Sequence, residues 1–364
     1  MASGESLPEV QVAYETYGEL SPTKDNAVLL FHALSGSQHA AGINTSVKGV
    51  DCWTEENHTG WWDDFIGPGK ALDTRKYFII CANFLGGCYG TTGPSSINPE
   101  TGKRYGREFP DVQMADIVNS QLGLVDYFGI EKLHAVIGPS IAGMMTLDLA
   151  TRFPERVNHV VVIASAVETS ILQRISNFEQ IVAIENDLNF NGGDYYGSEH
   201  PRVGLALARM IAHKSYVSLA ALERRAKNLI KDEREVVGRY QLNYPVESYM
   251  LHQGSSFIDR FDANSYILFC NAWQKFNLAK DAGAKDLPEI LSKCKDQKFL
   301  VFSIDSDVCF YPDEQLQLVN LLKEQKIDCQ YFIVHSDRGH DSFLLDPELF
   351  TPAIAYRLQE GLGG

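Results

Sequence analysis

Short apolar runs that alternate with segments of helical periodicity constrain the fold of this chain more than any other sequence feature. Each run is rich in β-branched and aromatic residues, which is typical of buried strands. The runs cover residues 27–31, 77–84, 133–137, 157–164, 299–304 and 330–334, and helical patterns cover residues 111–128, 141–153 and 313–323. Strands that alternate with helices predict an α/β fold with a mostly parallel sheet flanked by helices.

The stretch from residue 168 to residue 295 has a different pattern. Helical periodicity dominates there, for example at residues 204–213 and 218–230, and the strand-like runs resume only at residue 299. Insertions are tolerated where a connection crosses the surface, and they often cover a site. We therefore expect an α/β domain of residues 1–167 and 296–364 with an inserted helical lid domain of residues 168–295.

The most informative short motif is a strand that runs directly into Gly138-Pro-Ser-Ile-Ala-Gly143 and then into a helix. A serine in such a strand–turn–helix is typical of a nucleophile elbow, which exposes the hydroxyl above the edge of the sheet. Ala142 stands where the strict G-x-S-x-G pattern has its second glycine, and alanine is the next smallest residue. Ser140 is the candidate nucleophile; the alternative is a serine in an ordinary turn or at a helix N-terminus.

A serine nucleophile needs a base, and the base needs a group that orients it. His340 follows the strand-like run 330–334, and both Asp305 and Asp307 follow the run 299–304. Because α/β sheets place ligands at the carboxyl ends of their strands, these side chains are expected at one edge. The order Ser, Asp, His along the chain is the order of the α/β-hydrolase fold. We predict His340 as the base and leave the choice between the two aspartates open here.

Two backbone N–H groups are candidates for stabilising an oxyanion. The amide of Ile141 directly follows the nucleophile, and that of Leu34 lies in the loop after the run 27–31. This is the pair of positions that the fold uses for an oxyanion hole. His32 and His39 in the same loop are interpreted as residues that structure the loop, not as bases.

The composition excludes several classes of protein. Acidic residues outnumber basic ones by 47 to 32, giving a formal charge of −15, which disfavours broad binding to nucleic acid or to an anionic membrane. No apolar run approaches the roughly 18 residues of a membrane-spanning helix, and a secretory signal pattern is missing from the first residues. The seven cysteines show neither paired nor metal-ligand spacing, so we expect a cytoplasmic protein with no bound metal.

With these residues in place, nearly the whole chain resembles the homoserine O-acetyltransferase family of α/β-hydrolase-fold acyltransferases. The segments that carry the resemblance are long and distinctive. They are Val12-Ala-Tyr-Glu-Thr-Tyr-Gly-Glu-Leu20, His32-Ala-Leu-Ser-Gly36, Gly60-Trp-Trp-Asp-Asp-Phe-Ile-Gly-Pro-Gly-Lys-Ala-Leu-Asp-Thr74, Gly86-Gly-Cys-Tyr-Gly-Thr-Thr-Gly-Pro94, Asn98-Pro-Glu-Thr-Gly102 and Arg260-Phe-Asp-Ala-Asn-Ser-Tyr266.

The resemblance implies roles for individual residues. Ser140 is expected to be acylated, with His340 as base and Asp307, chosen over Asp305 by the family motif, as its orienter. The residues expected to contact substrate are Arg209, Tyr216 and Asp341. The sequence itself allows Arg209 to be either a solvated helix residue or an interior one. The resemblance also implies acetyl-CoA, or another acyl-CoA, as co-substrate, no tightly bound cofactor, small-molecule substrates, and a homodimer formed through the helical region.

The chain departs from the family pattern at positions that bear on the substrate. Pro139, Ala142 and Met145 replace two glycines and a glutamine around the nucleophile, and the usual Ala-Met-Asp stretch of the lid reads Ala272-Trp-Gln274. The expected reaction is acetyl transfer to the γ-hydroxyl of L-homoserine in methionine biosynthesis. L-serine as acceptor, succinyl-CoA as donor, an esterase that uses the same triad, and a silent binding protein are the alternatives.

Overall fold

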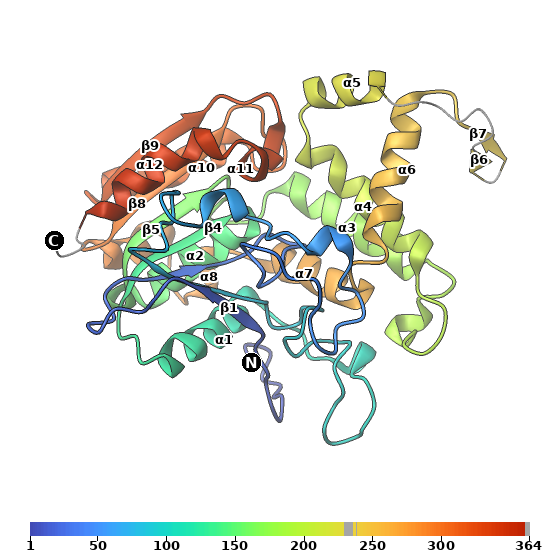
Figure 1. Cartoon of the computed structure of the whole chain (residues 1–364), viewed down its shortest axis with the longest axis horizontal. Coiled ribbons are helices and arrows are strands. Elements are labelled where there is room, and N and C mark those ends of the chain that lie inside the picture. Colours follow the sequence, from blue (N-terminus) through green and yellow to red (C-terminus); the bar gives the residue numbers. More distant parts are fainter. Residues whose placement is uncertain (229–235, 238, 361–364) are drawn as a thin grey trace.

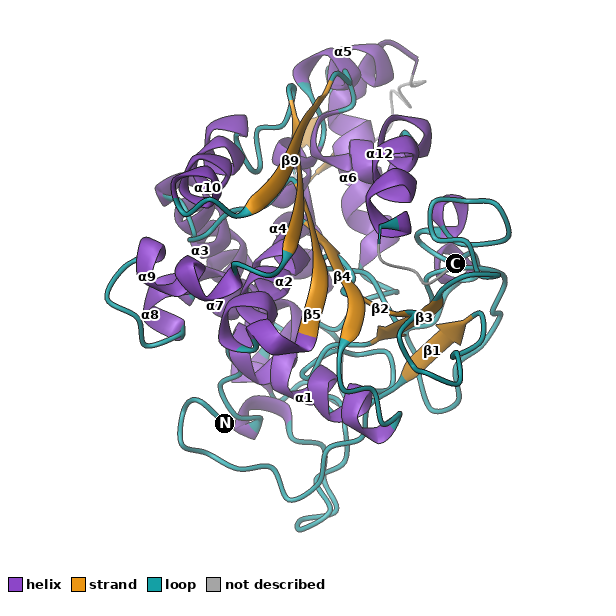
Figure 2. Cartoon of the chain, turned by 90° about the vertical axis from the view of Figure 1, so that its left-hand side faces the viewer, coloured by secondary structure: helices purple, strands orange, loops and turns teal. Residues whose placement is uncertain are grey.

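A seven-stranded, twisted sheet forms the centre of the molecule (Figures 1 and 2). The computed structural model describes residues 1–228, 236–237 and 239–360. In sheet order the strands are β1 (Tyr14–Tyr17), β3 (Phe78–Ala82), β2 (Ala27–Leu30), β4 (Leu133–Pro139), β5 (Val157–Ile163), β8 (Lys298–Ile304) and β9 (Asp328–Val334). β1 pairs antiparallel with β3, and the other neighbours are parallel. The predicted mostly parallel α/β sheet is confirmed, and β1 is a strand that the apolar runs did not predict.

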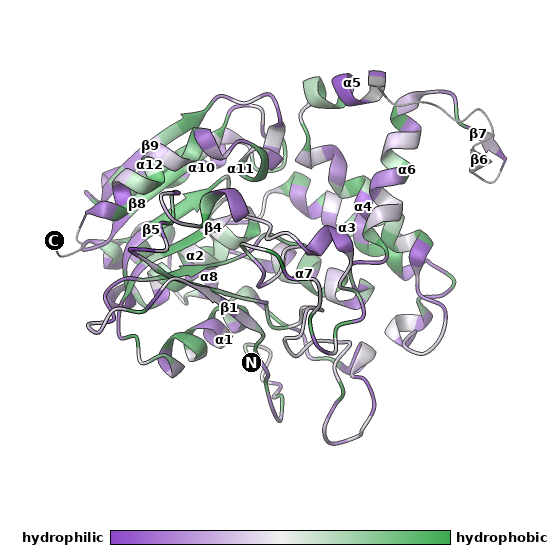
Figure 3. Ribbon diagram, viewed as in Figure 1, coloured by the Kyte–Doolittle hydropathy of each residue, from purple (hydrophilic) through white to green (hydrophobic). Residues whose placement is uncertain are grey.

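Alternate residues of the parallel strands belong to two separate apolar clusters, one on each face of the sheet. Leu29 and Val160 belong to the larger cluster, whereas Leu30 and Val161 belong to the other. The larger cluster is shared with α1 (Met114–Tyr127), α2 (Ile141–Arg152) and α10 (Pro312–Glu324), and the other with α12 (Pro347–Gln359). Burial on both faces explains why the inner strands β2, β4 and β5 are largely hydrophobic along their length (Figure 3).

The segment between β5 and β8 is mainly helical and extends to one side of the sheet (Figure 1). Its helices are α3 (Ile171–Glu185), α4 (Arg202–Tyr216), α5 (Leu219–Asn228), α6 (Pro245–Phe257), α7 (Ala263–Lys275), α8 (Leu278–Asp281) and α9 (Leu287–Leu291). It also contains a short antiparallel pair, β6 (Val236–Val237) and β7 (Tyr240–Gln241), which the helical pattern did not predict. The predicted helix 218–230 corresponds to α5, and its last two residues lie outside the described residues.

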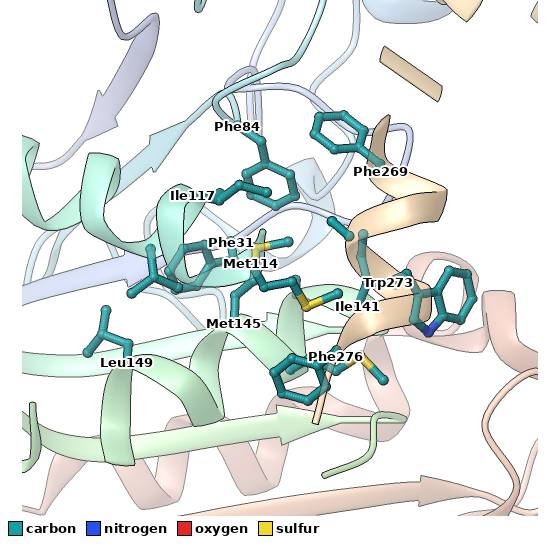
Figure 4. Packing of buried hydrophobic residues seen from close by; sticks show 14 of the residues in the cluster. Phe31, Phe84, Met114, Ile117, Ile141, Met145, Leu149, Phe269, Trp273 and Phe276 are labelled. Atoms are coloured by element: carbon teal, nitrogen blue, oxygen red, sulfur yellow. The ribbon is translucent and has the colours of Figure 1, made fainter. Parts of the chain in front are cut away.

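The helical segment is joined to the α/β part by packing around α2. Phe269 and Phe276, from α7 and its end, share the larger cluster with Met145 of α2 and with Phe84 (Figure 4). α8 and α9 also contact α2. The division into two domains at residues 168 and 295 therefore stays a prediction.

Shorter elements complete the chain. One-turn α11 covers Ser342–Leu345, and 3-10 helices cover Glu55–Asn57, Asp63–Phe65, Gly106–Glu108, Pro154–Arg156, Asn191–Gly193, Ser292–Cys294 and Gly339–Asp341. Of the helices that the structure describes, none has the length and apolarity that crossing a bilayer requires. Within the same residues, no group of three or more His, Cys, Asp or Glu side chains is arranged to hold a metal ion.

Candidate active site

The sharp turn between β4 and α2 places Ser140 at the carboxyl edge of the sheet. Its backbone has φ +60° and ψ −134°, a conformation that costs a non-glycine residue on the order of 1–3 kcal/mol. The turn is held by hydrogen bonds of 2.9 Å from the Ser140 N–H to the Ile163 carbonyl and from the Gly143 N–H to the Ser140 carbonyl. A Cβ added to Gly138 would lie 2.3 Å from the carbonyl oxygen of Ala142, so this glycine is sterically required.

A continuous chain of hydrogen bonds links Ser140, His340 and Asp307, the three side chains that the sequence predicts as a triad. His340 Nε2 lies 2.8 Å from Ser140 Oγ, and His340 Nδ1 lies 2.6 Å from Asp307 Oδ2. The second carboxylate oxygen of Asp307 accepts the N–H groups of Cys309 and Phe310, at 2.8 and 3.0 Å. All three side chains are buried, so water competes little for these bonds. The arrangement allows His340 to take the serine proton while Asp307 fixes the imidazole tautomer.

The protonation equilibrium of His340 reflects two opposing effects. Burial disfavours the imidazolium, but the charge of Asp307 and the hydrogen bond to it favour that form, and the net result is a pKa above the usual histidine value. His340 is therefore a stronger base than an isolated imidazole, as proton abstraction from a hydroxyl requires.

Asp305 is directed away from this chain of hydrogen bonds. Its Oδ2 lies 2.8 Å from Nδ1 of His335, a pair at the surface. Its other oxygen accepts the Ser336 N–H at 3.2 Å. Of the two aspartates at the end of β8, Asp307 is thus the one in contact with His340.

The two candidate oxyanion donors lie at the ends of neighbouring strands. Ile141 is the first residue of α2, so its N–H belongs to the helix N-terminus, where backbone N–H groups lack intrahelical partners. Leu34 is buried in the loop after β2, and β2 pairs in parallel with β4. In the same loop, His32 is stacked on Phe84 with ring centres 3.6 Å apart, and burial lowers its pKa to about 4. His32 is therefore a packed, neutral loop residue.

Three residues expected to contact substrate gather near His340, because α4 contacts Gly339–Asp341. The Tyr216 ring centre lies 6.1 Å from that of His340. The Arg209 guanidinium lies 5.4 Å from the centre of the Tyr216 ring, is half-buried, and forms no ion pair with any residue that the structure describes. Burial raises the pKa of Asp341, and the charge of Arg209 is the largest opposing influence. A half-buried arginine whose charge acts on a nearby carboxylate offers both charges that the two ends of an amino acid need.

Aromatic residues support His340 in a way that sequence reasoning missed. Phe310 stacks on the imidazole at 5.4 Å, and Trp273 stacks on Phe310 at 5.4 Å with an interplanar angle of 7°. Phe343 meets His340 edge-on at 5.2 Å. Phe310 and Phe343 each follow a candidate residue by three positions, which could have indicated them. Trp273 comes from α7 and gave no such signal.

The residues that depart from the family pattern fall into two environments. Ala142 and Met145 are fully buried, and Met145 packs in the apolar cluster beside α7 (Figure 4). Trp273 instead lines a small cavity beside the candidate triad, together with Tyr216.

Comparison with known proteins agrees with this geometry. Residues 26–347 match the model of the α/β hydrolase fold family, to which the chain therefore belongs. A homoserine O-acetyltransferase of Methanococcus vannielii is 42% identical over 360 residues, which are 99% of this chain and 70% of that protein. The chain is thus a member of the homoserine O-acetyltransferase family, an acyltransferase-like enzyme. A homoserine O-succinyltransferase of Alkalilimnicola ehrlichii is also 42% identical, over 98% of this chain and 91% of that protein.

Solved structures with the same fold include a transferase and an esterase. A homoserine O-acetyltransferase from Bacillus anthracis has a TM-score of 0.86 at 29% identity, covering 98% of this chain and 94% of that one. Esterase E22 has a TM-score of 0.87 at 28% identity, covering 98% and 96%. The fold is therefore shared by enzymes named for different reactions, and the residues of the site must distinguish them.

Proposed function

We propose that the protein transfers an acetyl group from acetyl-CoA to the γ-hydroxyl of L-homoserine, through an acyl-enzyme formed on Ser140. The observation that carries the proposal is the buried hydrogen-bonded chain from Ser140 through His340 to Asp307, in a chain 42% identical over 99% of its length to a homoserine O-acetyltransferase. We place the reaction in methionine biosynthesis and in the cytoplasm, where its seven free cysteines would stay reduced.

The first half-reaction acylates the enzyme. His340 Nε2 takes the proton of Ser140 as its oxygen attacks the thioester carbonyl. The N–H groups of Leu34 and Ile141 stabilise the resulting oxyanion. The carbon–sulfur bond then breaks, and the CoA thiolate leaves with the proton returned by His340.

The second half-reaction transfers the acyl group. The carboxylate of homoserine pairs with Arg209, and its ammonium with Asp341, which places the γ-hydroxyl near His340. His340 takes the hydroxyl proton, the oxygen attacks the acyl carbonyl, and the ester bond to Ser140 breaks as the serine recovers that proton. An ammonium beside Asp341 also favours the ionised carboxylate that burial disfavours.

Two alternatives have specific support. The homoserine O-succinyltransferase is as similar in sequence as the acetyltransferase and is covered over a larger share, which keeps succinyl-CoA as a second candidate donor. The likeness to esterase E22 keeps hydrolysis as a competing outcome, because water can replace the acceptor in the second half-reaction.

Thiol release from acetyl-CoA tests the proposal directly. We expect rapid release with L-homoserine, much slower release with L-serine, and slow release without an amino acid, because only homoserine combines the charges for Arg209 and Asp341 with a hydroxyl at the right distance. Parallel reactions with succinyl-CoA identify the donor. Release that is equally fast without any amino acid would show that the enzyme is a hydrolase.

We further propose that the protein is a homodimer formed through α3. This helix exposes a stripe of apolar side chains, namely Ile171, Ile175, Phe178 and Val182. The spacing of four, three and four residues places them on one face, as in helices that pair with a partner helix. A second copy presenting the same stripe would bury both faces in a two-fold interface.

Charges in the middle of the α3 stripe should prevent this association. We expect the double variant Ile175→Asp/Phe178→Asp to sediment as a monomer while the unchanged protein sediments as a dimer, because each buried carboxylate would lack a partner. Analytical ultracentrifugation measures the difference. Tyr127→Asp, an exposed aromatic residue on α1, is the matched control and should remain dimeric. A double variant that still sediments as a dimer would exclude α3 as the interface.

A further inference from the structure

Three carboxamide side chains occupy one buried face of α3, at positions 173, 177 and 180. The outer two are paired: Gln173 donates to the Cys309 carbonyl at 2.8 Å, and Gln180 accepts from the Tyr266 hydroxyl at 2.6 Å. The middle one, Asn177, is only 1% exposed, and neither its carbonyl oxygen nor its amide nitrogen has a hydrogen-bond partner among the described residues. A buried carboxamide with both ends unpaired is rare and calls for an explanation.

Asn177 lines a cavity of about 140 Å³ between α3, the end of α4, α7 and the loop after β8. Trp273 lines the same cavity, and its indole N–H is also buried without a partner in the described structure. Figure 4 shows Trp273 projecting from α7 at the edge of the buried cluster. The cavity wall therefore offers two unpaired donors, the amide nitrogen of Asn177 and the indole N–H of Trp273, and one unpaired acceptor, the side-chain oxygen of Asn177. A cavity of this size accommodates about six non-hydrogen atoms.

The cavity lies beside the candidate triad: its described lining includes Cys309, whose N–H bonds Asp307, but neither Ser140 nor His340. Leu172 and Val308, at its outer side, are exposed. On its inner side, Tyr216 lies with its ring centre 6.1 Å from that of His340. Trp273 is separated from His340 only by the stacked ring of Phe310. A ligand in this cavity would therefore lie one aromatic ring away from His340.

The chemistry of the lining selects the class of ligand. No Lys, Arg, Asp or Glu belongs to the described lining, so the charged ends of an amino-acid acceptor are better served by Arg209 and Asp341. A neutral group that both donates and accepts could pair with Asn177 through one end and with Trp273 through the other, and a secondary amide is such a group. The arm that carries the thioester of an acyl-CoA contains secondary amides joined by short carbon chains. One such amide with its neighbouring carbons has about as many non-hydrogen atoms as the cavity accommodates.

We propose that Asn177 and Trp273 form the binding site for an amide of the acyl donor's arm. This inference rests on the proposed function, since it assumes a thioester donor that acylates Ser140. The side-chain oxygen of Asn177 accepts from the N–H of the amide, and the indole N–H of Trp273 donates to the carbonyl, which a trans amide presents on its opposite side. The site thus fixes the position of the donor's arm, so that its thioester is directed toward Ser140.

Donors with and without the amide test the inference. We expect Asn177→Leu, which keeps the volume and removes both polar atoms, to raise KM about three- to tenfold for acetyl-CoA and for S-acetyl-N-acetylcysteamine. The acylation rate with p-nitrophenyl acetate, which lacks the arm, should be unchanged, as should KM for homoserine. Glu179→Gln, on the exposed face of α3, is the control and should alter none of these values.

Trp273→Phe provides a second test should Asn177→Leu fold poorly, because it keeps an aromatic ring to stack on Phe310 and removes the indole N–H together with the five-membered part of the ring. This variant should likewise raise KM for acetyl-CoA and for S-acetyl-N-acetylcysteamine, and leave the acylation rate with p-nitrophenyl acetate unchanged. Equal losses with all donors, unchanged KM for acetyl-CoA, or an effect on KM for homoserine alone would overturn the inference. Acylation is measured as the burst of thiol or nitrophenol in the absence of an acceptor. If the unchanged protein is acylated but does not transfer the acyl group to homoserine, the proposed function fails while the donor site can still be tested.

Discussion

Replacing Ser140 by alanine should lower kcat for thiol release from acetyl-CoA on the order of 10⁴-fold or more. The variant has no oxygen to receive the acyl group, whereas His340, Asp307 and the backbone N–H donors remain. Any residual turnover would be direct attack by homoserine or water. Steady-state thiol release measures the loss, and intact-protein mass spectrometry after mixing with acetyl-CoA should show one added acetyl group on the unchanged protein and none on the variant.

The control for this substitution is Ser120→Ala on α1, where the hydroxyl bonds only the Ile117 carbonyl of its own helix. It should keep full activity and become acetylated. Ser140→Ala should also melt within a few degrees of the unchanged protein, because it removes one hydrogen bond, worth about 1 kcal/mol, at a backbone already strained for serine. Substantial turnover or acetylation in the folded Ser140→Ala variant would show that the nucleophile lies elsewhere.

The sequence predicts those parts of the site that depend on local structure. Ser140 follows from a strand, a turn and a helix that adjoin each other along the chain, and the six parallel strands follow from continuous apolar runs. β1 has no such run, because its residues alternate between exposed and half-buried at the edge of the sheet. It is specified by pairing with β3, more than 60 residues away, and not by its own composition.

α3 shows why the rest of the site could not be predicted. Its apolar residues at 171, 175, 178 and 182 are exposed, and its carboxamides at 173, 177 and 180 are buried. The usual rule that the apolar face of a helix packs inward therefore gives the wrong orientation. In our proposals a second copy of the chain covers the apolar face, and the acyl donor pairs with a carboxamide on the buried face; neither molecule is encoded in the helix's own pattern.

The second prediction with a large expected effect distinguishes the two aspartates after β8. Asp307→Asn should lower kcat about 10⁴-fold. An asparagine amide can donate to His340 Nδ1, which leaves the proton on Nε2 and removes the acceptor for the serine proton. The Oδ1 of the introduced side chain could still accept the Cys309 and Phe310 N–H groups, so the loop should keep its shape. Asp305→Asn breaks only an exposed contact to His335, worth about 0–1 kcal/mol, and should keep activity within about threefold.

The pH dependence of kcat/KM separates an orienting role of Asp307 from a merely structural one. His340 must be neutral to act as base, so activity rises as the pH increases through its pKa. Asp307 raises this pKa against the opposing effect of burial. Removing the carboxylate charge therefore lowers the pKa of His340, and the acidic limb of the residual activity should move to lower pH. In the Asp305→Asn variant the limb should stay in place, because that carboxylate does not contact His340. An acidic limb that moves with Asp305→Asn and not with Asp307→Asn would show that Asp305 is the residue that orients the base.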